Sequence, residues 1–400
     1  MATNSLLTIN MITREALRLF RNSNYFLRNV NRQFDDSFAK TGAKIGSTLR
    51  IRLPNDYIVN VGKTITPENT TEVNTTLTVA TQANVPISFG SAEKALSLDD
   101  FSSRILKPAV NNLAGYVAAD LMNAVEGSCN YVSKTDGAGN LLSPDASTWL
   151  LAGAKLDNNS APKADRKIIL DPLSQARTVA SLAGLFNPQR KVSDQYVTGE
   201  MQEDTLGFDW GMDQTVIKHT NGSFTAGTVS TGGQTGNTLA TNAITGSLNK
   251  GDIITIAGVF AINRITKNTT GELQQFVVTA AVTSGATAIP IYPAITPGNV
   301  QYGTVTASPL ANATITLLGG ANLIYRKNFA YHPEAFALAT ADMELPKGVH
   351  EAARESYDNL SCRIVSQYAV LSDDFITRLD VLYGYQSIRP EWIVCVPDVL

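Results

Sequence analysis

Gly246–Ala280 reads GSLNKGDIITIAGVFAINRITKNTTGELQQFVVTA, and the chain later continues as NFAYHPEAFALATADMELP at Asn328–Pro346. Gly251 and Asp252 form a turn dipeptide, and the alternation from Ile253 to Ile262 predicts a strand. This stretch belongs to a compositional unit, residues 222–322, that holds only five charged side chains. Short strand-like runs recur there at roughly ten-residue spacing. We therefore predict a small β-barrel or sandwich over residues 222–322.

The residues before this unit predict further helices and strands. A broken apolar stripe from Ile12 to Phe34 indicates a helix, and residues 48–89 contain strand-like runs rich in valine, isoleucine and threonine. From Ser97, a candidate N-cap, apolar residues recur at three- and four-residue spacing as far as Gly127. This predicts a long helix, and Pro108 within it should kink or divide it.

The segments on either side of residues 222–322 predict a second layered body. Lys167–Leu170 has the apolar run of a buried strand, and Pro172 begins a helix that we expect to reach Leu185. Three more strands are predicted after the unit, over Arg363–Val370, Phe375–Tyr383 and Trp392–Val396.

Composition limits the class of protein. The chain has 400 residues, so two or more hydrophobic cores are expected. Charged residues make up 17% of the chain, below the usual ~25%, which suits a protein whose faces are covered by neighbours. A net charge of −3 argues against binding to nucleic acid by bulk electrostatics. The three cysteines lack metal or redox spacing, and neither a signal peptide nor a membrane span is predicted.

No constellation of residues predicts catalysis. The three histidines lack metal-site spacing, and the glycine-rich stretches at 137–139 and 232–236 lack the residues of a phosphate loop. The acidic pair Asp99 and Asp100 is explained by helix capping, and Asp373 and Asp374 by a loop before a strand. We therefore expect no catalytic, cofactor or metal site, although sequence distance does not rule out a triad assembled in space.

The order of several sequence words carries a family resemblance. They are KGD, ITIAGV, AIN, TKNTTGELQQF, VVTA and FAYHPEAFALAT, followed by LPKGVHEAARESYDNLSCRIVSQYAV at Leu345–Val370 and RLDVLYGYQSIRPEWIV at Arg378–Val394. This order resembles the major capsid (coat) proteins of tailed bacteriophages. It is most similar to short-tailed-phage coat proteins that carry a β-domain inserted in the HK97-type shell fold, and a weaker likeness covers the first ~130 residues.

The resemblance implies an α+β HK97-type capsid fold with an inserted small β-barrel domain. Its expected parts are an N-terminal arm at 1–45, an extended β-hairpin loop at 46–95, a spine helix of the peripheral domain at 96–135, an axial α/β domain at 136–221, the inserted β-domain at 222–322, and a return to the axial and peripheral domains at 323–400. The hairpin loop would lie across a neighbouring subunit, which supplies the packing that an isolated ribbon lacks.

The implied function is structural and non-catalytic. The chain would self-assemble as hexamers and pentamers into the icosahedral head shell around double-stranded DNA, in the host bacterial cytoplasm, and would then reside in the virion. A scaffolding protein, a portal protein and non-specifically bound DNA are the implied partners, with no membrane and no cofactor, and a decoration protein stays open. Two alternatives stay open as well: a cellular nanocompartment shell of the same fold, and a β-rich adhesin or carbohydrate-binding protein.

Opposite charge blocks suggest where subunits meet. Residues 1–52 carry nine basic side chains against three acidic ones, and residues 342–374 carry seven acidic against three basic. We hypothesise that these blocks pair between subunits, while pairing within one subunit and a solvated helix face are the alternatives. The candidate interface residues are Arg14, Arg18, Arg21, Arg28, Arg32, Glu344, Glu351, Glu355, Asp373 and Asp374.

Overall fold

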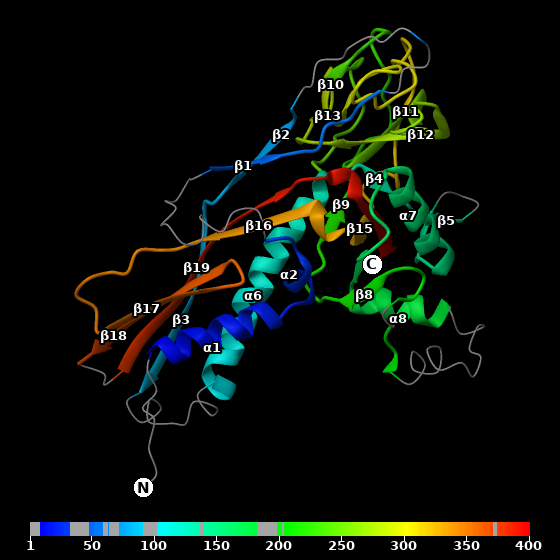
Figure 1. Cartoon of the computed structure of the whole chain (residues 1–400). Coiled ribbons are helices and arrows are strands. Elements are labelled where there is room, and N and C mark those ends of the chain that lie inside the picture. Colours follow the sequence, from blue (N-terminus) through cyan, green and yellow to red (C-terminus); the bar gives the residue numbers. More distant parts are fainter. Residues whose placement is uncertain are drawn as a thin grey trace. The chain divides into compact units, whose positions relative to one another are not determined.

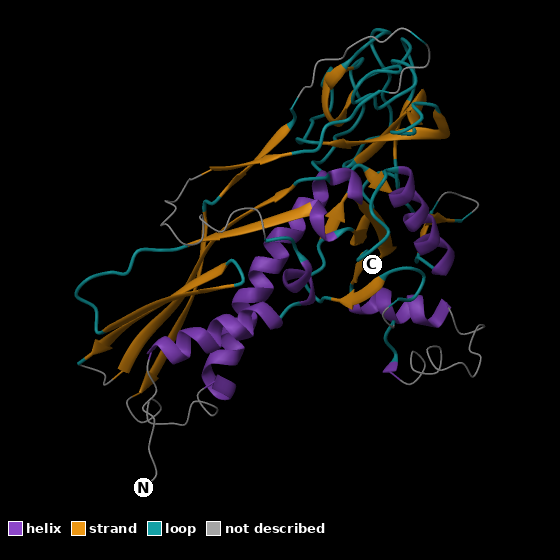
Figure 2. Cartoon of the chain, in the orientation of Figure 1, coloured by secondary structure: helices purple, strands orange, loops and turns teal. Residues whose placement is uncertain are grey.

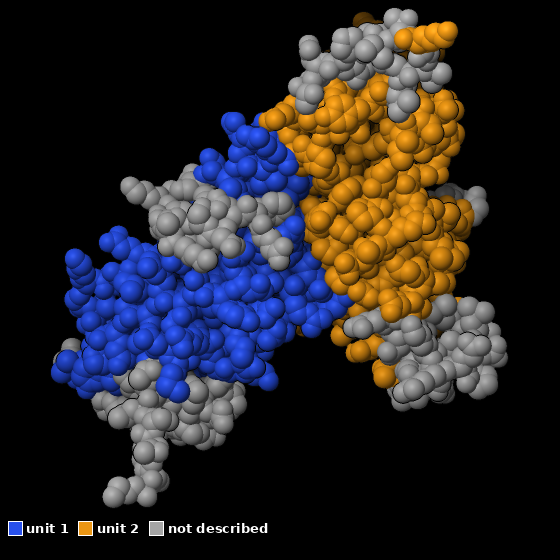
Figure 3. Space-filling view, viewed as in Figure 1, with its two compact units in different colours: residues 1–52, 74–121, 336–388 blue, residues 53–73, 122–335, 389–400 orange. Residues whose placement is uncertain are grey.

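The computed structural model folds into two compact units (Figures 1 and 3). Unit 1 combines residues 1–52, 74–121 and 336–388, and unit 2 combines residues 53–73, 122–335 and 389–400. The residues described are 9–32, 48–58, 63, 72–90, 102–136, 140–181, 198–201, 204–370 and 374–400. Each unit is therefore built from segments that are far apart in the sequence.

Unit 1 is organised around the long strand β19. The order of its sheet is β16-β19-β18-β17, and β3 also pairs with β19. Residues 374–380 of β19 pair with both β18 and β3, so these two strands occupy opposite edges of β19. Residues 382 and 383 of β19 pair with both β3 and β16. β16 therefore lies on the same edge of β19 as β18, and follows β18 along that edge. The bounds are Thr81–Gly90 (β3), Phe336–Ala341 (β16), Glu351–Tyr357 (β17), Leu360–Ala369 (β18) and Asp374–Ser387 (β19).

The predicted helix over Ile12–Phe34 is wrong as a single element. The structure has α1 at Ile9–Asn22 and a separate short helix, α2, at Tyr25–Asn29. Asn24 between them is extended, and its side-chain oxygen accepts hydrogen bonds from the amides of Phe26 and Leu27 at 2.8 and 3.2 Å. An asparagine N-cap therefore ends one helix and starts the next. The buried face of α1 packs on β17 and β18.

The long predicted helix is continuous through the described residues Ser102–Gly127, but its type changes. A π-helix at Ser102–Leu106 passes into α6 at Lys107–Met122, and a 3₁₀-helix follows at Asn123–Gly127. Pro108 is the second residue of α6, directly after the π-helix, so the residue that lacks an N–H stands where the helical hydrogen-bond pattern changes. The proline therefore marks the change from π to α rather than a break, and the predicted start at Ser97 lies outside the described residues.

The strand-rich region 48–89 divides between two sheets. β1 at Thr48–Arg52 and β2 at Asn74–Thr78 form a separate two-stranded antiparallel sheet. β3 instead pairs with β19 over ten residue pairs. The C-terminal part of the predicted hairpin loop is thus held within unit 1 of its own chain.

Unit 2 contains a six-stranded sheet in the order β4-β20-β15-β7-β8, with β9 also paired to β15. β7 is the predicted strand Lys167–Leu170, and β20 covers the predicted strand Trp392–Val396 except for its first residue. Two helices accompany this sheet, α7 at Ala146–Asn158 and α8 at Pro172–Ser181; the rest of the helix predicted to reach Leu185 lies outside the described residues (Figure 2). The other bounds are Asn130–Tyr131 (β4), Lys134–Thr135 (β5), Leu141–Leu142 (β6), Asp209–Met212 (β8), Lys218–Thr220 (β9), Ile324–Tyr331 (β15) and Ile393–Val399 (β20), with 3₁₀ turns at Pro333–Ala335 and Pro390–Trp392.

Residues 222–322 form a second sheet within unit 2, in the antiparallel order β10-β13-β12-β11-β14. β11 spans Ile253–Ile262, as the sequence predicts, and the others are Gly236–Ala240 (β10), Thr269–Val278 (β12), Ala288–Ile295 (β13) and Ile315–Leu317 (β14). One hydrophobic cluster fills this sheet, and every buried member lies between Phe224 and Leu317. The segment, all of which is described, contains strands and loops but no helix (Figure 2).

In the described part of the chain, no helix is both long and apolar enough to cross a bilayer.

Candidate assembly surfaces

The basic residues of α1 and its continuation lie against acidic residues of the same chain. The Nε of Arg14 lies 3.2 Å from Glu355 Oε1, and Arg21 and Arg32 both contact Asp358 Oδ2, at 2.9 and 2.7 Å. Arg32 is largely buried, and this desolvation lowers the pKa of its guanidinium despite the neighbouring carboxylate. The two opposite charge blocks therefore meet within one subunit, which is the alternative that the sequence left open.

Other predicted interface residues are placed differently. Arg18 pairs with Glu15 of its own helix at 2.6 Å, and Arg28 lies over the ring of Tyr25 with 5.6 Å between the guanidinium carbon and the centroid. Glu344 is exposed, and its backbone carbonyl accepts a hydrogen bond from Arg363. Glu351 begins the edge strand β17 and Asp374 begins β19, while Asp373 lies outside the described residues.

A surface hollow of about 440 Å³ lies between α1 and β17. Leu17 and Tyr357 contribute apolar surface to its lining, and the guanidinium carbon of Arg21 lies 5.4 Å from the centroid of the Tyr357 ring. The remaining lining residues are polar or charged: Arg14, Arg18, Asn22, Glu355 and Ser356. The lining of the hollow thus combines apolar side chains with three arginines.

A buried polar cluster lies where the segment 222–322 joins the six-stranded sheet. The carboxylate of Asp252 is fully buried, and its Oδ1 lies 2.8 Å from His219 Nε2. Its Oδ2 accepts hydrogen bonds from the amides of Gly222 at 3.0 Å and Asn249 at 2.8 Å. Gly251 beside it has φ of +91°, and a Cβ there would lie 3.1 Å from the imidazole, so glycine allows the turn to pass close to His219.

Two more charged groups complete the buried cluster. Glu126 lies 3.9 Å from His219 Nδ1, and the fully buried Lys327 directs its Nζ to the Gly251 carbonyl at 3.4 Å. Burial acts to raise the pKa of Glu126, but the interactions with His219 and Lys327 outweigh it, so this pKa lies below its ordinary value. Buried polar and charged side chains therefore contact one another where the two sheets join.

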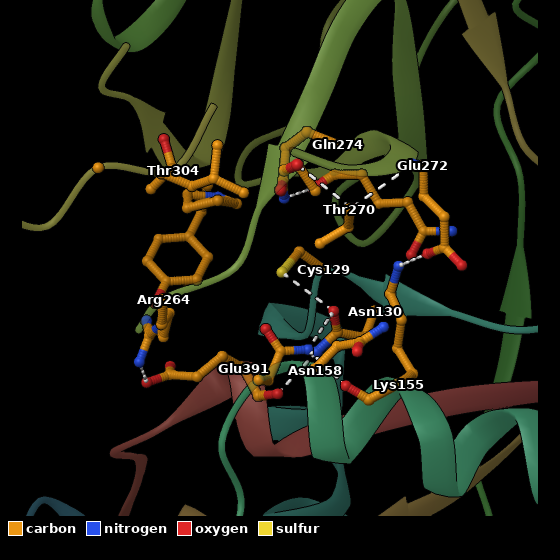
Figure 4. A pocket seen from close by; sticks show the side chains of 17 residues that line it. Cys129, Asn130, Lys155, Asn158, Arg264, Thr270, Glu272, Gln274, Thr304 and Glu391 are labelled. Carbon is orange, nitrogen blue, oxygen red and sulfur yellow. Dashed lines mark hydrogen bonds and ion pairs between the residues drawn. The ribbon is translucent and has the colours of Figure 1, made fainter. Parts of the chain in front are cut away.

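Two ion pairs cross a polar cavity of about 70 Å³ in unit 2 (Figure 4). Lys155 of α7 contacts Glu272 of β12 at 2.9 Å, and Arg264 contacts Glu391 at 3.1 Å. Ligand pockets usually measure about 300–1,000 Å³, so this cavity is too small for a drug-sized molecule. Its side chains join the five-stranded sheet to the body of unit 2.

The three cysteines are not activated nucleophiles. All are buried, and burial raises the pKa of Cys129 and Cys362 to about 12 and that of Cys395 to about 11. A thiol needs a lowered pKa to act as a nucleophile near neutral pH. Among the described residues, no group of three or more histidine, cysteine, aspartate or glutamate side chains could hold a metal ion.

Sequence reasoning missed the cluster around Asp252. The Gly-Asp pair indicated only a turn, and His219 had no partner in sequence because Asp252 is 33 residues away. The signal that could have found it is the scarcity of charge, because an aspartate inside an otherwise neutral, apolar segment needs a partner if it is buried.

A family model described as "P22 coat protein - gene protein 5" matches residues 1–395. The chain belongs to this family. No curated protein matches the chain. Membership in the P22 coat protein family thus rests on a match over nearly the whole chain.

Several solved structures are similar to the chain. The capsid of Ralstonia phage GP4 has 7% identity and a TM-score of 0.45, and covers 93% of this chain and 87% of its own. A Mycobacterium phage Che8 structure has 10% identity and a TM-score of 0.43, with 93% and 90% covered. A structure titled "CUS-3 coat protein I-domain" has 28% identity and a TM-score of 0.20 over 24% of this chain and 95% of its own.

As a member of the P22 coat protein family, the chain is a phage major capsid protein that forms the head shell. It has the α+β capsid fold, associates with copies of itself, and is a component of the virion. It is a structural protein and not an enzyme.

Proposed function

We propose that the shell is built on an HK97-type subunit in which residues 222–322 form an inserted β-domain. The observation that supports this is the hydrophobic cluster of the five-stranded sheet, whose buried members all come from Phe224–Leu317. A segment with its own apolar core can fold as a unit and be carried by a larger fold. The peripheral and axial domains are then formed by the flanking segments, with the boundaries given above.

Deletion tests this part of the proposal. Replacing Gly222–Asn322 by a short glycine-serine linker should leave a foldable subunit, because Asn221 and Leu323 already meet through a 2.9 Å backbone hydrogen bond. We expect this subunit to be defective in assembly. Regular shells of normal size from the deletion variant would refute the assembly role of the segment.

We propose further that assembly takes place in the host cytoplasm around a scaffolding protein, and that DNA enters through a portal protein. Packaged DNA would be met through non-specific phosphate contacts, with a steep salt dependence. A decoration protein on the outer surface is an additional candidate partner. Electron microscopy of the purified chain, with and without a co-expressed scaffolding protein, tests this: closed shells only with the scaffold support the proposal, and uniform monomers in both samples contradict it.

Arg18 and Arg28 are our candidates for the electrostatic contact between subunits. Both belong to the basic block, yet neither contacts the acidic segment 342–374 of the same chain, unlike Arg14 and Arg21: Arg18 pairs with Glu15 of its own helix, and Arg28 lies over the ring of Tyr25. We propose that these two side chains meet the acidic segment of a neighbouring subunit. A double charge reversal, Arg18→Glu with Arg28→Glu, should lower shell yield, and a normal yield would exclude this contact.

A further inference from the structure

Helix α7 is apolar on both of its sides. Its inner side carries Trp149, which packs edge-to-face on Trp210 of β8 with 5.4 Å between ring centroids, together with buried Ala152 and Leu156. Its outer side carries Leu150 and Leu151, which are 53% and 59% exposed. A surface helix normally has a polar outer side, and a helix that is apolar all round is normally covered all round.

The charged residues of α7 lie near the two ends of the helix and not in the middle of its outer side. The N-cap Asp145 binds Lys134 at 2.7 Å, and Lys155 is directed to Glu272 at 2.9 Å. Asp157 pairs with Arg166 at 2.6 Å. Between the N-cap and Lys155, the helix therefore presents an uncharged outer strip at helical spacing: Ser147, Leu150, Leu151 and Ala154.

Helix α1 shows the opposite arrangement within the same chain. Its inner side is equally apolar, with Ala16, Leu17 and Phe20 buried, but its outer side carries Arg14 and Arg18. A charged outer side, which suits solvent or an electrostatic contact, is thus available to a helix of this chain. The leucines of α7 therefore mark a side that another surface covers.

We propose that the outer strip of α7, centred on Leu150 and Leu151, is a contact surface for a second copy of this chain. The occupant follows from the family, because a shell protein must cover its neighbours with copies of itself, and the inference rests on that assembly function. An uncharged strip is suited to contact between two copies, because it brings no unpaired charge into the interface. The contact is then formed by apolar burial and stays effective at high salt.

The first test is the double variant Leu150→Gln with Leu151→Gln in the full-length chain, assembled with and without scaffolding protein and followed by sedimentation. We expect an unchanged melting temperature, because both side chains are exposed, and at least a tenfold rise in the concentration needed for assembly. The conservative variant Leu150→Met with Leu151→Met should assemble normally, and Leu173→Gln, at a position 42% exposed on α8, is the matched control. Failure of the unmodified chain to assemble would count against the shell function itself, whereas normal assembly of the glutamine variant would overturn only this inference.

A second test identifies the occupant directly. A photo-crosslinking amino acid at position 151 should yield a covalent dimer of this chain in assembled particles and little in unassembled subunits. Adducts with scaffolding protein alone, or no adduct in complete shells, would overturn the proposal even if the glutamine variant failed to assemble.

Discussion

Asp252 is the single side chain whose loss should loosen the attachment of segment 222–322 most. Its fully buried carboxylate serves His219, the Gly222 amide and the Asn249 amide, at 2.8, 3.0 and 2.8 Å. Asp252→Ala leaves all three groups without this partner, and each buried polar group left unpaired costs about 1–3 kcal/mol. Asp252→Asn keeps an oxygen for the two amides and turns its NH₂ toward Nε2 of a neutral imidazole in the tautomer that accepts there, so its cost should be about 1 kcal/mol.

Hydrogen exchange measures this difference where it arises. A loss of about 3 kcal/mol in opening free energy should speed exchange of the β11 and β12 amides roughly 100-fold in the alanine variant, because about 1.4 kcal/mol corresponds to a factor of ten. Lys250→Ala is the neighbouring control, because that side chain is mostly exposed and its Nζ is 3.9 Å from the nearest carboxylate oxygen. Exchange within about threefold of the unmodified chain, or equal effects of alanine and asparagine, would refute the assignment of Asp252 as the buried link.

Three other outcomes test separate parts of the fold. Burial acts to raise the pKa of Asp145, but hydrogen bonds from Lys134 and other groups hold it well below its ordinary value. The ionised carboxylate of Asp145 therefore stabilises the fold above about pH 4, and this stabilisation is lost as the pH falls further. In thermal melts, Asp145→Ala should cost ~1 kcal/mol near neutral pH and less on acidification. A pKa of about 12 for Cys129 and Cys362 predicts labelling by thiol reagents at pH 8 roughly a thousandfold slower than in denaturant; equal rates would contradict their burial. Gly384→Ala would place a Cβ against the Thr78 carbonyl oxygen at the end of β2, and calorimetry should show about 1–3 kcal/mol of destabilisation, against none for Gly127→Ala, where a Cβ would meet no atom within 4 Å.

Strands with a clear local sequence pattern were predicted correctly. The alternation of Ile253–Ile262 and the apolar run of Lys167–Leu170 define β11 and β7 with the predicted bounds. The break at Asn24 was missed because a broken apolar stripe reads as one helix unless the asparagine is recognised as a cap. Pro108 was read as an interruption because periodicity does not reveal that the regular α-helix begins one residue before it.

The candidate surfaces were predicted less well, because they depend on which distant segments pair. β3 joins β19 across nearly 300 residues, and no local feature of Thr81–Gly90 specifies that partner. The basic and acidic blocks were identified correctly as opposite charges, but composition does not decide whether they meet within a chain or between chains. The structure places Arg14 beside Glu355 of the same subunit. A contact with a neighbouring subunit therefore remains a proposal for Arg18 and Arg28, which do not contact the acidic segment of their own chain.

The distribution of charge suggests how one chain can assemble reversibly and still form a durable shell. An exposed ion pair between subunits contributes only about 0–1 kcal/mol and weakens with salt, so such pairs favour correct orientation more than strength. An uncharged strip such as the outer side of α7 contributes by apolar burial, at about 25 cal/mol per Å², and salt does not screen it. A contact of a few kcal/mol corresponds to roughly millimolar affinity, which lets a misplaced subunit leave. When several such contacts form together, release requires all of them to break at once, and the closed shell persists although each contact is weak.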